Sequence, residues 1–295
     1  MKKILLTGKS GQVGWELQRT LAPLGQVIAL DSAELDLADA DAIRRKVREI
    51  QPHIIVNPAA YTAVDKAESE PDLAMSINGI APGVFAEEAK KLNALFVHYS
   101  TDYVFDGSKI GAYHEEDAPN PLGVYGKTKL EGERAIRAVG GNHLILRTSW
   151  VYGARGKNFL LTMLRLARER SELRIVNDQI GAPTWCRSLG EITAQMLAQL
   201  YAPGAGKEEL ARVSGTYHLT SAGSVSWHGF AAEIIRLAEI QPAPNLVAIP
   251  SHEYPTPAVR PMNSVLSNDK LARTFGLHAG SWQDNLQLCM GERAI

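Results

Sequence analysis

A tyrosine and a lysine four residues apart, Tyr125 and Lys129, have the spacing in this chain that most directly suggests acid–base chemistry. Residues 124–139 are rich in Lys, Glu, Ala and Leu and contain no proline, which predicts a helix. Residues i and i+4 share one face of a helix, so the phenol would lie beside a cation. Because an opposite charge favours the ionised form, we expect a lowered phenol pKa and proton exchange near neutral pH. A half-buried tyrosine followed by a solvated lysine is the plainer alternative for the pair alone.

The N-terminal segment has the pattern of a strand, a glycine turn and a helix. An apolar run over residues 2–7 leads into Gly8, Gly11 and Gly14, and an amphipathic stretch follows over 15–24. This G-x-x-G-x-x-G spacing permits a tight turn and a close backbone approach, and a helix N-terminus favours a pyrophosphate. The segment therefore predicts a dinucleotide site, with a plain tight turn as the alternative.

The second predicted strand, residues 26–30, ends in Asp31. An acid about 20 residues beyond the glycines is placed to accept hydrogen bonds from an adenosine ribose. A carboxylate repels a 2′-phosphate, which favours NADH, whereas Lys9 and Ser10 could help to hold that phosphate and admit NADPH. We therefore expect NADPH or NADH, with a helix cap as the alternative role for Asp31.

Two more apolar runs, 53–57 and 95–101, end in small or polar residues. Pro-Ala-Ala-Tyr-Thr follows the first run, and the second ends in Ser100 and Thr101. Small residues at the carboxyl end of a strand let a cofactor lie close, where open α/β sheets bind their ligands. A helical pattern over 73–92 separates the two runs. Strands that alternate with helices in this way predict a Rossmann-like, doubly wound parallel sheet.

The second half of the chain predicts a smaller, interleaved lobe of mixed α/β structure. We assign residues 1–150 to a dinucleotide-binding domain, to which 188–220 return, and residues 151–187 and 221–295 to a substrate-binding lobe. The proline-rich segment 242–261 is expected to be an irregular ordered loop over the substrate site.

A few single features have their own interpretations. Trp150, at a predicted strand end, is expected to offer an aromatic plate to a sugar or thymine ring, with core packing as the alternative. His98 and His218 lie on buried strands and are interpreted as core residues. Residues 204–209 are expected to be an exposed loop or a helix start.

Composition excludes several function classes. Lys and Arg number 31 against 32 for Asp and Glu, without a long basic run, which argues against a nucleic-acid partner. Cys186 and Cys289 match no metal or redox spacing, which indicates a reducing compartment. We find neither a signal peptide nor an apolar run near the ~20 residues that a membrane span needs. The expectation is a cytoplasmic protein with no membrane partner.

Combined, these motifs resemble the extended short-chain dehydrogenase/reductase superfamily. Longer strings resemble the dTDP-4-dehydrorhamnose reductase family more closely, and the resemblance runs from Lys2 to about the final predicted helix. These strings are residues 8–14, 62–68, 100–107, 147–152 and 177–184, with Arg260-Pro261 late in the chain. They are specific in the first 185 residues and looser after.

The resemblance implies a role for each matching position. Cofactor contacts fall at Gly8, Gly11, Gln12, Val13, Gly14, Asp31, Asp36, Leu37, Ala60, Tyr61, Thr62, Tyr99, Tyr125 and Lys129. Substrate contacts fall at Thr101, Asp102, Trp150 and Arg260. Arg260 would lie near the substrate diphosphate, where a guanidinium is the preferred partner. Tyr125, Lys129 and Thr101 would be catalytic.

The resemblance also implies the reaction. A hydride from NADPH or NADH would reduce the C4 carbonyl of dTDP-4-dehydro-L-rhamnose to give dTDP-L-rhamnose, used in cell-wall polysaccharide and lipopolysaccharide synthesis. Tyr125 would donate a proton to the C4 oxygen and Thr101 would hydrogen-bond to it. Lys129 would bind the nicotinamide ribose and stabilise the phenolate. A related dTDP-4-keto-6-deoxy sugar remains open as the substrate.

One position departs from the family. Some members dimerise around a divalent cation such as Mg²⁺, held in part by an acid three residues past the Gly-x-Pro-Thr string. That position here is Arg187, and a guanidinium cannot ligate a cation. We therefore expect no metal and a monomer or weak homodimer.

Two other functions remain as alternatives. Nucleotide-sugar dehydratases of the same superfamily carry an Asp-Glu pair after the fourth strand, whereas Asp102 is followed here by Tyr103. Epimerases and dehydratases regenerate their cofactor, so stoichiometric NADH consumption would separate them from a reductase. A non-catalytic regulatory subunit with this fold is the other alternative, and an intact Tyr125, Lys129 and Thr101 argues against it.

Overall fold

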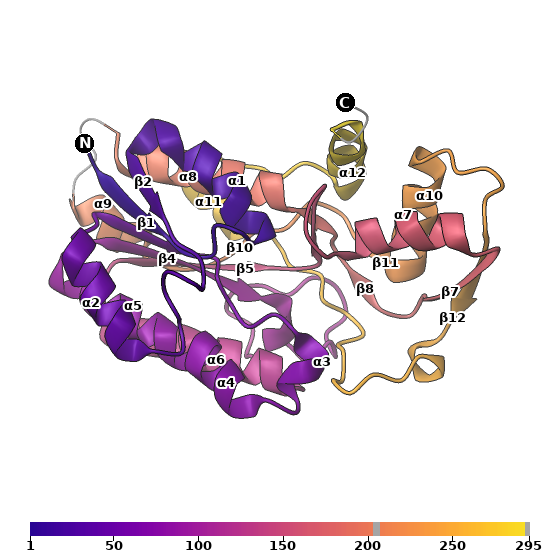
Figure 1. Cartoon of the computed structure of the whole chain (residues 1–295), viewed down its shortest axis with the longest axis horizontal. Coiled ribbons are helices and arrows are strands. Elements are labelled where there is room, and N and C mark those ends of the chain that lie inside the picture. The colour runs from indigo at the N-terminus through magenta and orange to yellow at the C-terminus, as the bar shows by residue number, and fades with distance from the viewer. Residues whose placement is uncertain (203–206, 293–295) are drawn as a thin grey trace.

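The computed structural model describes residues 1–202 and 207–292, which form a parallel sheet covered by helices on both faces and a smaller lobe beside it (Figure 1). The sheet has six parallel strands in the order β10-β5-β4-β3-β1-β2. Its strands are β1 (Lys3–Leu6), β2 (Gln26–Ala29), β3 (Ile54–Asn57), β4 (Leu95–Thr101), β5 (His143–Thr148) and β10 (Gly215–His218). The predicted doubly wound parallel sheet is confirmed.

Two helical layers bury the faces of the sheet (Figure 1). One layer consists of α1 (Gln12–Leu21), α8 (Cys186–Leu200) and α11 (Asp269–Phe275). The opposite layer consists of α2 (Ala40–Ile50), α4 (Pro71–Met75), α5 (Ala81–Lys91) and α6 (Val124–Val139). The strands alternate between the two cores: Ile4 and Leu6 pack with the first layer, and Leu5 packs with the second. Strands buried on both faces account for the continuous apolar runs in the sequence.

The sheet changes direction beside β1. This strand pairs with β2 on one side and β3 on the other, so the chain leaves β1 toward one edge and returns toward the other. The connections at the carboxyl ends of β1 and β3 therefore diverge and leave a crevice, the usual ligand position in open α/β sheets.

Helix α6 extends over Val124–Val139, as the sequence predicted. It ends at Gly140, whose φ of +69° is the left-handed conformation that favours glycine at a helix end. The helix expected over 73–92 is divided into α4, a π-helical turn η2 (Ser76–Ile80) and α5. Pro82 lies in the first turn of α5, directly after the π-helical turn, and its missing backbone N–H removes one bond of the ladder where the helix changes type.

The smaller lobe is built from helices α7 (Phe159–Glu169), α10 (Trp227–Leu237) and α12 (Trp282–Gly291) with short strand pairs. One correction concerns the proline-rich segment 242–261. It contains strand β12 (Asn245–Ile249), which pairs in parallel with β7 (Glu172–Val176). The prolines flank this strand without interrupting it, so composition concealed a regular element.

The remaining strand pairs of the lobe are β6 (Val151–Tyr152) with β9 (Thr184–Trp185) and β8 (Ile180–Gly181) with β11 (Val225–Ser226). Short helical turns are η1 (Ala22–Leu24), α3 (Val64–Ala67), η3 (Asp102–Val104) and η4 (Ser251–Glu253). Helix α9 (Lys207–Val213) precedes β10, and the first part of the loop or helix start expected over 204–209 lies outside the described residues.

The chain returns to the sheet within 188–220: α8 packs against α1, and β10 extends the sheet beside β5. We retain the division into a nucleotide domain and a substrate lobe as a proposal. Across the two described ranges, the helices fall short of the length and apolar character that a membrane crossing requires.

Candidate active site

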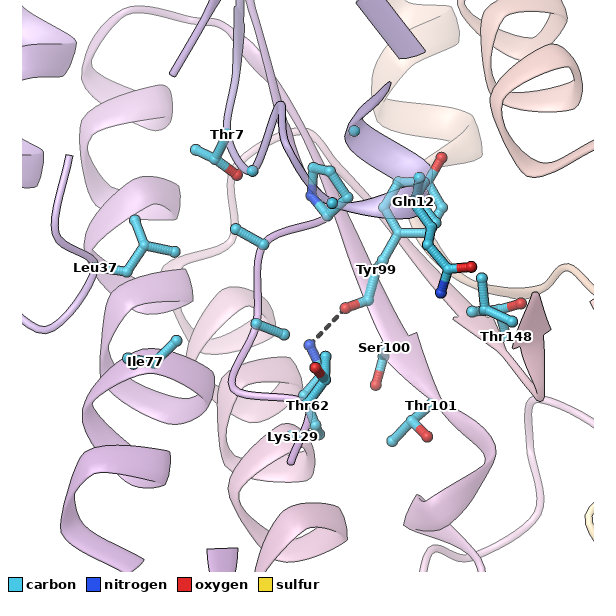
Figure 2. Close-up of a pocket in the computed structure, with 18 of the residues that line it drawn as sticks. Thr7, Gln12, Leu37, Thr62, Ile77, Tyr99, Ser100, Thr101, Lys129 and Thr148 are labelled. Atoms are coloured by element: carbon cyan, nitrogen blue, oxygen red, sulfur yellow. Dashed lines mark hydrogen bonds between the residues drawn. The ribbon is translucent and has the colours of Figure 1, made fainter. Parts of the chain in front are cut away.

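A cavity of about 690 Å³ lies at the carboxyl ends of the central strands, and Figure 2 shows part of its wall. It is bounded by the glycine turn, the ends of β3, β4 and β5, and helix α6. Most of the residues singled out from the sequence line it. These are Gly8, Gly11, Gln12, Val13, Gly14, Asp31, Asp36, Leu37, Ala60, Thr62, Tyr99, Thr101, Asp102, Tyr125, Lys129 and Trp150.

The glycine turn forms one end of the cavity. Gly8 has a φ of +63°, and a Cβ on Gly14 would lie 2.0 Å from the Gly8 carbonyl oxygen. Only glycine therefore lets the turn fold back against the start of α1. The first backbone N–H groups of that helix have no intrahelical acceptor and carry the positive end of the helix dipole. This end of the cavity fits the pyrophosphate of a dinucleotide.

Helix α6 supplies a row of functional side chains at intervals of four residues: Tyr125, Lys129 and Glu133. The Nζ atom of Lys129 donates to the Tyr99 carbonyl at 2.6 Å and lies 3.0 Å from His98 Nε2 (Figure 2 shows the first bond). Burial lowers the pKa of Lys129 to about 7, against the raising effect of the Glu133 charge. Both charge states of this amine are therefore accessible near neutral pH.

The prediction of a lowered phenol pKa was wrong. Burial raises the pKa of Tyr125 to about 12; a hydrogen bond with the Thr101 hydroxyl lowers it and the charge of Asp102 raises it further. Desolvation by the surrounding side chains outweighs any effect of the amine one turn along the helix. The phenol is protonated at neutral pH, which suits a proton donor.

Asp102 follows Thr101 at the end of β4 and is 2% exposed. Its Oδ1 atom accepts a 2.9 Å hydrogen bond from the Thr101 hydroxyl, while Oδ2 is buried without a hydrogen-bond partner among the described residues. Burial raises the pKa of Asp102 to about 7, although the Thr101 and Ser264 hydroxyls act to lower it. An unpartnered buried oxygen on a cavity wall is a candidate ligand contact.

Charged side chains gather at the far end of the cavity, after β2. Lys9 Nζ lies 2.5 Å from Glu34 Oε2 and 3.9 Å from Asp31 Oδ2. The Asp31 side chain also accepts a hydrogen bond from the Ala33 N–H. Asp31 is thus not an isolated acid at the end of the strand: a lysine offsets its charge.

Trp150 forms part of the opposite wall. Its backbone φ is +45°, unusual for a bulky residue, and its indole stacks on Trp227 at 3.5 Å between ring centroids. A Cβ on Gly181 would lie 2.5 Å from the Trp150 ring, so the indole is enclosed on this side as well. Trp227 and Gly181 therefore hold the indole of Trp150 in the position where the sequence predicted an aromatic surface for the substrate.

Two sequence-predicted residues do not line the cavity. The Tyr61 hydroxyl donates to Glu70 at 2.6 Å, so its side chain points away from the cavity. Arg260 Nη2 lies 2.8 Å from Asp65 Oδ2, an ion pair that joins the segment after β12 to helix α3. Arg260 is thus held close to the nucleotide domain, outside the cavity wall.

The structure also shows functional neighbours that the sequence analysis missed. His98, interpreted as a core residue, is 1% exposed but contacts the amine of Lys129. Glu133 could have been found from the same i, i+4 spacing that identified Lys129. Gln12 accepts a 2.8 Å hydrogen bond from Asn158 at the start of α7, and so connects the glycine turn to the lobe. The His98–Lys129 and Gln12–Asn158 contacts pair residues distant in sequence, which no local motif signals.

At the departure from the family pattern, Arg187 pairs with Glu191 at 3.2 Å and also with Glu292. The guanidinium thus lies between two acids, one on α8 and one just after α12. Within residues 1–202 and 207–292, His, Cys, Asp and Glu side chains do not converge in threes in a way that could hold a metal ion.

Known proteins resemble this chain over nearly its whole length. The family model described as "RmlD substrate binding domain" matches residues 1–294. A dTDP-4-dehydrorhamnose reductase of Burkholderia thailandensis is 51% identical over 294 residues, covering 98% of each chain. The Escherichia coli K12 reductase of the same name is 47% identical, covering 98% of this chain and 97% of its own.

Solved structures resemble this chain over nearly its whole length as well. A dTDP-4-dehydrorhamnose reductase of Clostridium acetobutylicum superimposes with a TM-score of 0.91 at 38% identity, covering 99% of this chain and all of its own. The Bacillus anthracis reductase, solved in complex with NADP, gives 0.89 at 36% identity and 99% coverage of both chains. The chain belongs to the dTDP-4-dehydrorhamnose reductase family.

Proposed function

We propose that this chain reduces the C4 keto group of dTDP-4-dehydro-L-rhamnose to give dTDP-L-rhamnose, with Tyr125 as the proton donor. The observation that carries the proposal is the convergence of Tyr125, Thr101 and Lys129 on one cavity that begins at the glycine turn. A protonated phenol beside a hydroxyl is suited to a carbonyl oxygen that gains negative charge during reduction.

The cavity fits a nicotinamide cofactor. The glycine turn and the start of α1 would hold the pyrophosphate, Asp31 and Leu37 the adenosine, and Ala60 with Thr62 the middle of the molecule. Once bound, NAD(P)H supplies the hydride. Lys129, at the other end of the cavity, would bind the nicotinamide ribose through an N–H that its contacts with Tyr99 and His98 leave available.

Tyr125 and Thr101 act on the same substrate oxygen in this proposal. The high pKa of Tyr125 keeps the phenol protonated until charge develops on the C4 oxygen. Thr101 contacts both Tyr125 and Asp102, so its hydroxyl orients the donor from the side. After transfer, the phenolate would be stabilised by the nearby amine of Lys129.

The charges after β2 support use of both NADPH and NADH. Asp31 can accept hydrogen bonds from an unmodified ribose, whereas Lys9 can attract a 2′-phosphate and offset Asp31 and Glu34. The NADP bound to the Bacillus anthracis relative agrees with the phosphorylated form.

On the substrate side we propose Thr101, Asp102, Trp150 and Arg260 as contacts. Trp150 would stack against a ring of the substrate, and the free Oδ2 of Asp102 would accept from, or donate to, a sugar hydroxyl. For Arg260 to reach a diphosphate, the anion must compete with Asp65, because that carboxylate holds the guanidinium here. This competition favours a doubly charged diphosphate over a neutral sugar.

The paired Arg187 supports a site that does not need Mg²⁺, because the guanidinium already supplies a cation between Glu191 and Glu292. A monomer or weak homodimer, and a cytoplasmic location, remain predictions. Size measurement with and without a chelator would test the first: a dimer that dissociates in chelator would contradict it.

The function is tested by offering the purified protein the epimerised dTDP-4-keto sugar with each cofactor in turn. We expect one cofactor molecule oxidised for each dTDP-L-rhamnose formed, with the product identified by NMR. Product formation without net cofactor oxidation would instead indicate an epimerase or dehydratase. A lack of reaction with any dTDP-4-keto sugar would favour a regulatory subunit.

A further inference from the structure

A buried chain of hydrogen bonds leads from Lys129 across the sheet. Lys129 Nζ lies 3.0 Å from His98 Nε2, His98 Nδ1 lies 3.2 Å from Asn57 Nδ2, and the Thr7 hydroxyl lies 2.5 Å from Asn57 Oδ1. All four side chains are at most 2% exposed. The chain ends at Thr7, which lines the cavity below the glycine turn (Thr7 and Lys129 are labelled in Figure 2).

The sheet aligns these side chains. Asn57 and His98 are direct partners in the register of β3 and β4, and the Thr7 N–H bonds to Val56 on the neighbouring strand. The chain of hydrogen bonds therefore crosses the adjacent strands β1, β3 and β4 near their carboxyl ends and meets α6 at Lys129. Because strands fix their side chains more firmly than loops do, the geometry is held independently of a bound ligand.

The donors and acceptors in this chain of hydrogen bonds restrict where its protons can lie. A side-chain amide NH₂ can only donate, so with Asn57 Nδ2 facing the ring, His98 Nδ1 must accept. The ring proton then lies on Nε2 and points at Lys129, which must be an uncharged amine to accept it. If Lys129 is an ammonium, it donates to Nε2 instead, and the ring proton must lie on Nδ1 and bond to Asn57 Oδ1. The amide is then reversed, with Nδ2 toward the Thr7 hydroxyl, which can donate or accept.

We propose that Thr7, Asn57 and His98 are positioning residues that couple the charge of Lys129 to the tautomer of His98, so that the hydrogen bond between the buried amine and the ring is kept in either charge state. The proposal rests on the role given above to Lys129. His98 itself stays neutral, since burial and the charge of Lys129 lower its pKa well below the usual value. The ring changes the position of its proton rather than its charge.

The other charged groups around Lys129 do not replace this chain. Glu133 lies one turn along α6 and is held by Arg147 at 2.7 Å and by the Ser100 hydroxyl. Tyr125 lies one turn the other way, and Asp102 on η3 acts on Tyr125. Glu133 therefore favours the ammonium at all times, whereas the Asn57–His98 pair can adapt to either state.

Two substitutions of Asn57 test the coupling, because they should act in opposite directions. Asn57→Asp can only accept at His98 Nδ1, which fixes the Nδ1–H tautomer and favours the ammonium. Asn57→Leu removes both functions and surrounds the ring with an apolar side chain, so the Nδ1–H tautomer that accepts from the ammonium loses its hydrogen-bond acceptor. We expect the lysine-dependent limb of the kcat–pH profile to move upward by about one unit in Asn57→Asp and downward by a similar amount in Asn57→Leu. A merely structural role would lower the melting temperature without opposite pH shifts.

A second readout does not depend on turnover. Long-range ¹H–¹⁵N NMR spectra of ¹⁵N-histidine-labelled protein distinguish the two neutral tautomers, and a His98→Gln variant assigns the signal. Without cofactor, His98 should change from Nδ1–H to Nε2–H near pH 7, where Lys129 loses its proton. Thr193→Val is the matched control, because it removes another buried hydrogen bond on β4, the one between the Thr193 and Tyr99 hydroxyls. The tautomer change of His98 should persist in this variant.

Two results would contradict the proposed coupling. One His98 tautomer from pH 5 to 9, or Asn57 variants that shift the tautomer change in the same direction, would contradict the coupling. If the tautomer responds as expected while turnover is unaltered in both variants, the coupling holds and the catalytic role proposed for Lys129 fails.

Discussion

The indole rings of Trp150 and Trp227 stack with centroids 3.5 Å apart and planes 6° apart. Trp150 lines the cavity, whereas Trp227 begins helix α10 in the smaller lobe, behind the wall. Trp150 also has a backbone φ of +45°, a conformation that a bulky side chain adopts only when its surroundings hold it. Trp227 therefore fixes the orientation of the indole that we propose for substrate contact.

Replacing Trp227 with alanine should weaken substrate binding and leave the cofactor site intact. Stacking of aromatic pairs contributes about 1 kcal/mol beyond area burial, so we expect the KM for the dTDP-sugar to rise roughly fivefold. The KM for NADPH should change less than about twofold. Steady-state kinetics with each substrate varied provide the measurement. Trp227→Phe keeps a ring behind Trp150 and should behave closer to the unmodified protein; equal losses in both variants would refute this role.

Lys9 should govern the choice between the two cofactors. In Lys9→Ala, Asp31 and Glu34 lose their cation and would repel a 2′-phosphate. We expect the ratio of the KM for NADPH to that for NADH to rise by roughly 3- to 10-fold at low salt and by less at high salt, since exposed charges are screened. Glu34→Gln should change the same ratio in the opposite direction. An unchanged ratio in both variants would place the 2′-phosphate elsewhere.

Asp102 should make stability depend on pH. Its pKa is raised to about 7 in the fold, against about 4 in the unfolded chain, so the folded state holds a proton that the unfolded state has lost between these values. Its contribution to stability is fully present below pH 4 and is lost as pH rises toward 7, by at most about 1.4 kcal/mol per pH unit. Urea unfolding from pH 4 to 8 should show this slope, and Asp102→Asn should remove it. Parallel curves for the two proteins would show that Asp102 does not titrate as proposed.

The sequence predicted those parts of the site that depend on local patterns. Helix α6, the glycine turn and the strand ends follow from spacing and from the apolar runs of strands buried on both faces. The Tyr125 pKa was mispredicted because burial by distant segments outweighs a neighbour on the same helix. His98 could not be recognised as a neighbour of Lys129, because that contact depends on how α6 packs against β4. Strand β12 was missed because the prolines on either side of it have the composition of a loop.

The central claim is that Tyr125 gives the proton that completes ketone reduction, and Tyr125→Phe tests it most directly. A single-turnover experiment should follow oxidation of bound NADPH by saturating dTDP-4-keto sugar, with cofactor affinity measured separately by fluorescence titration. We expect the oxidation rate to fall by about 10²–10⁴-fold, as for loss of a general acid, with NADPH affinity changed less than about twofold. A near-unmodified oxidation rate with bound cofactor would contradict the account.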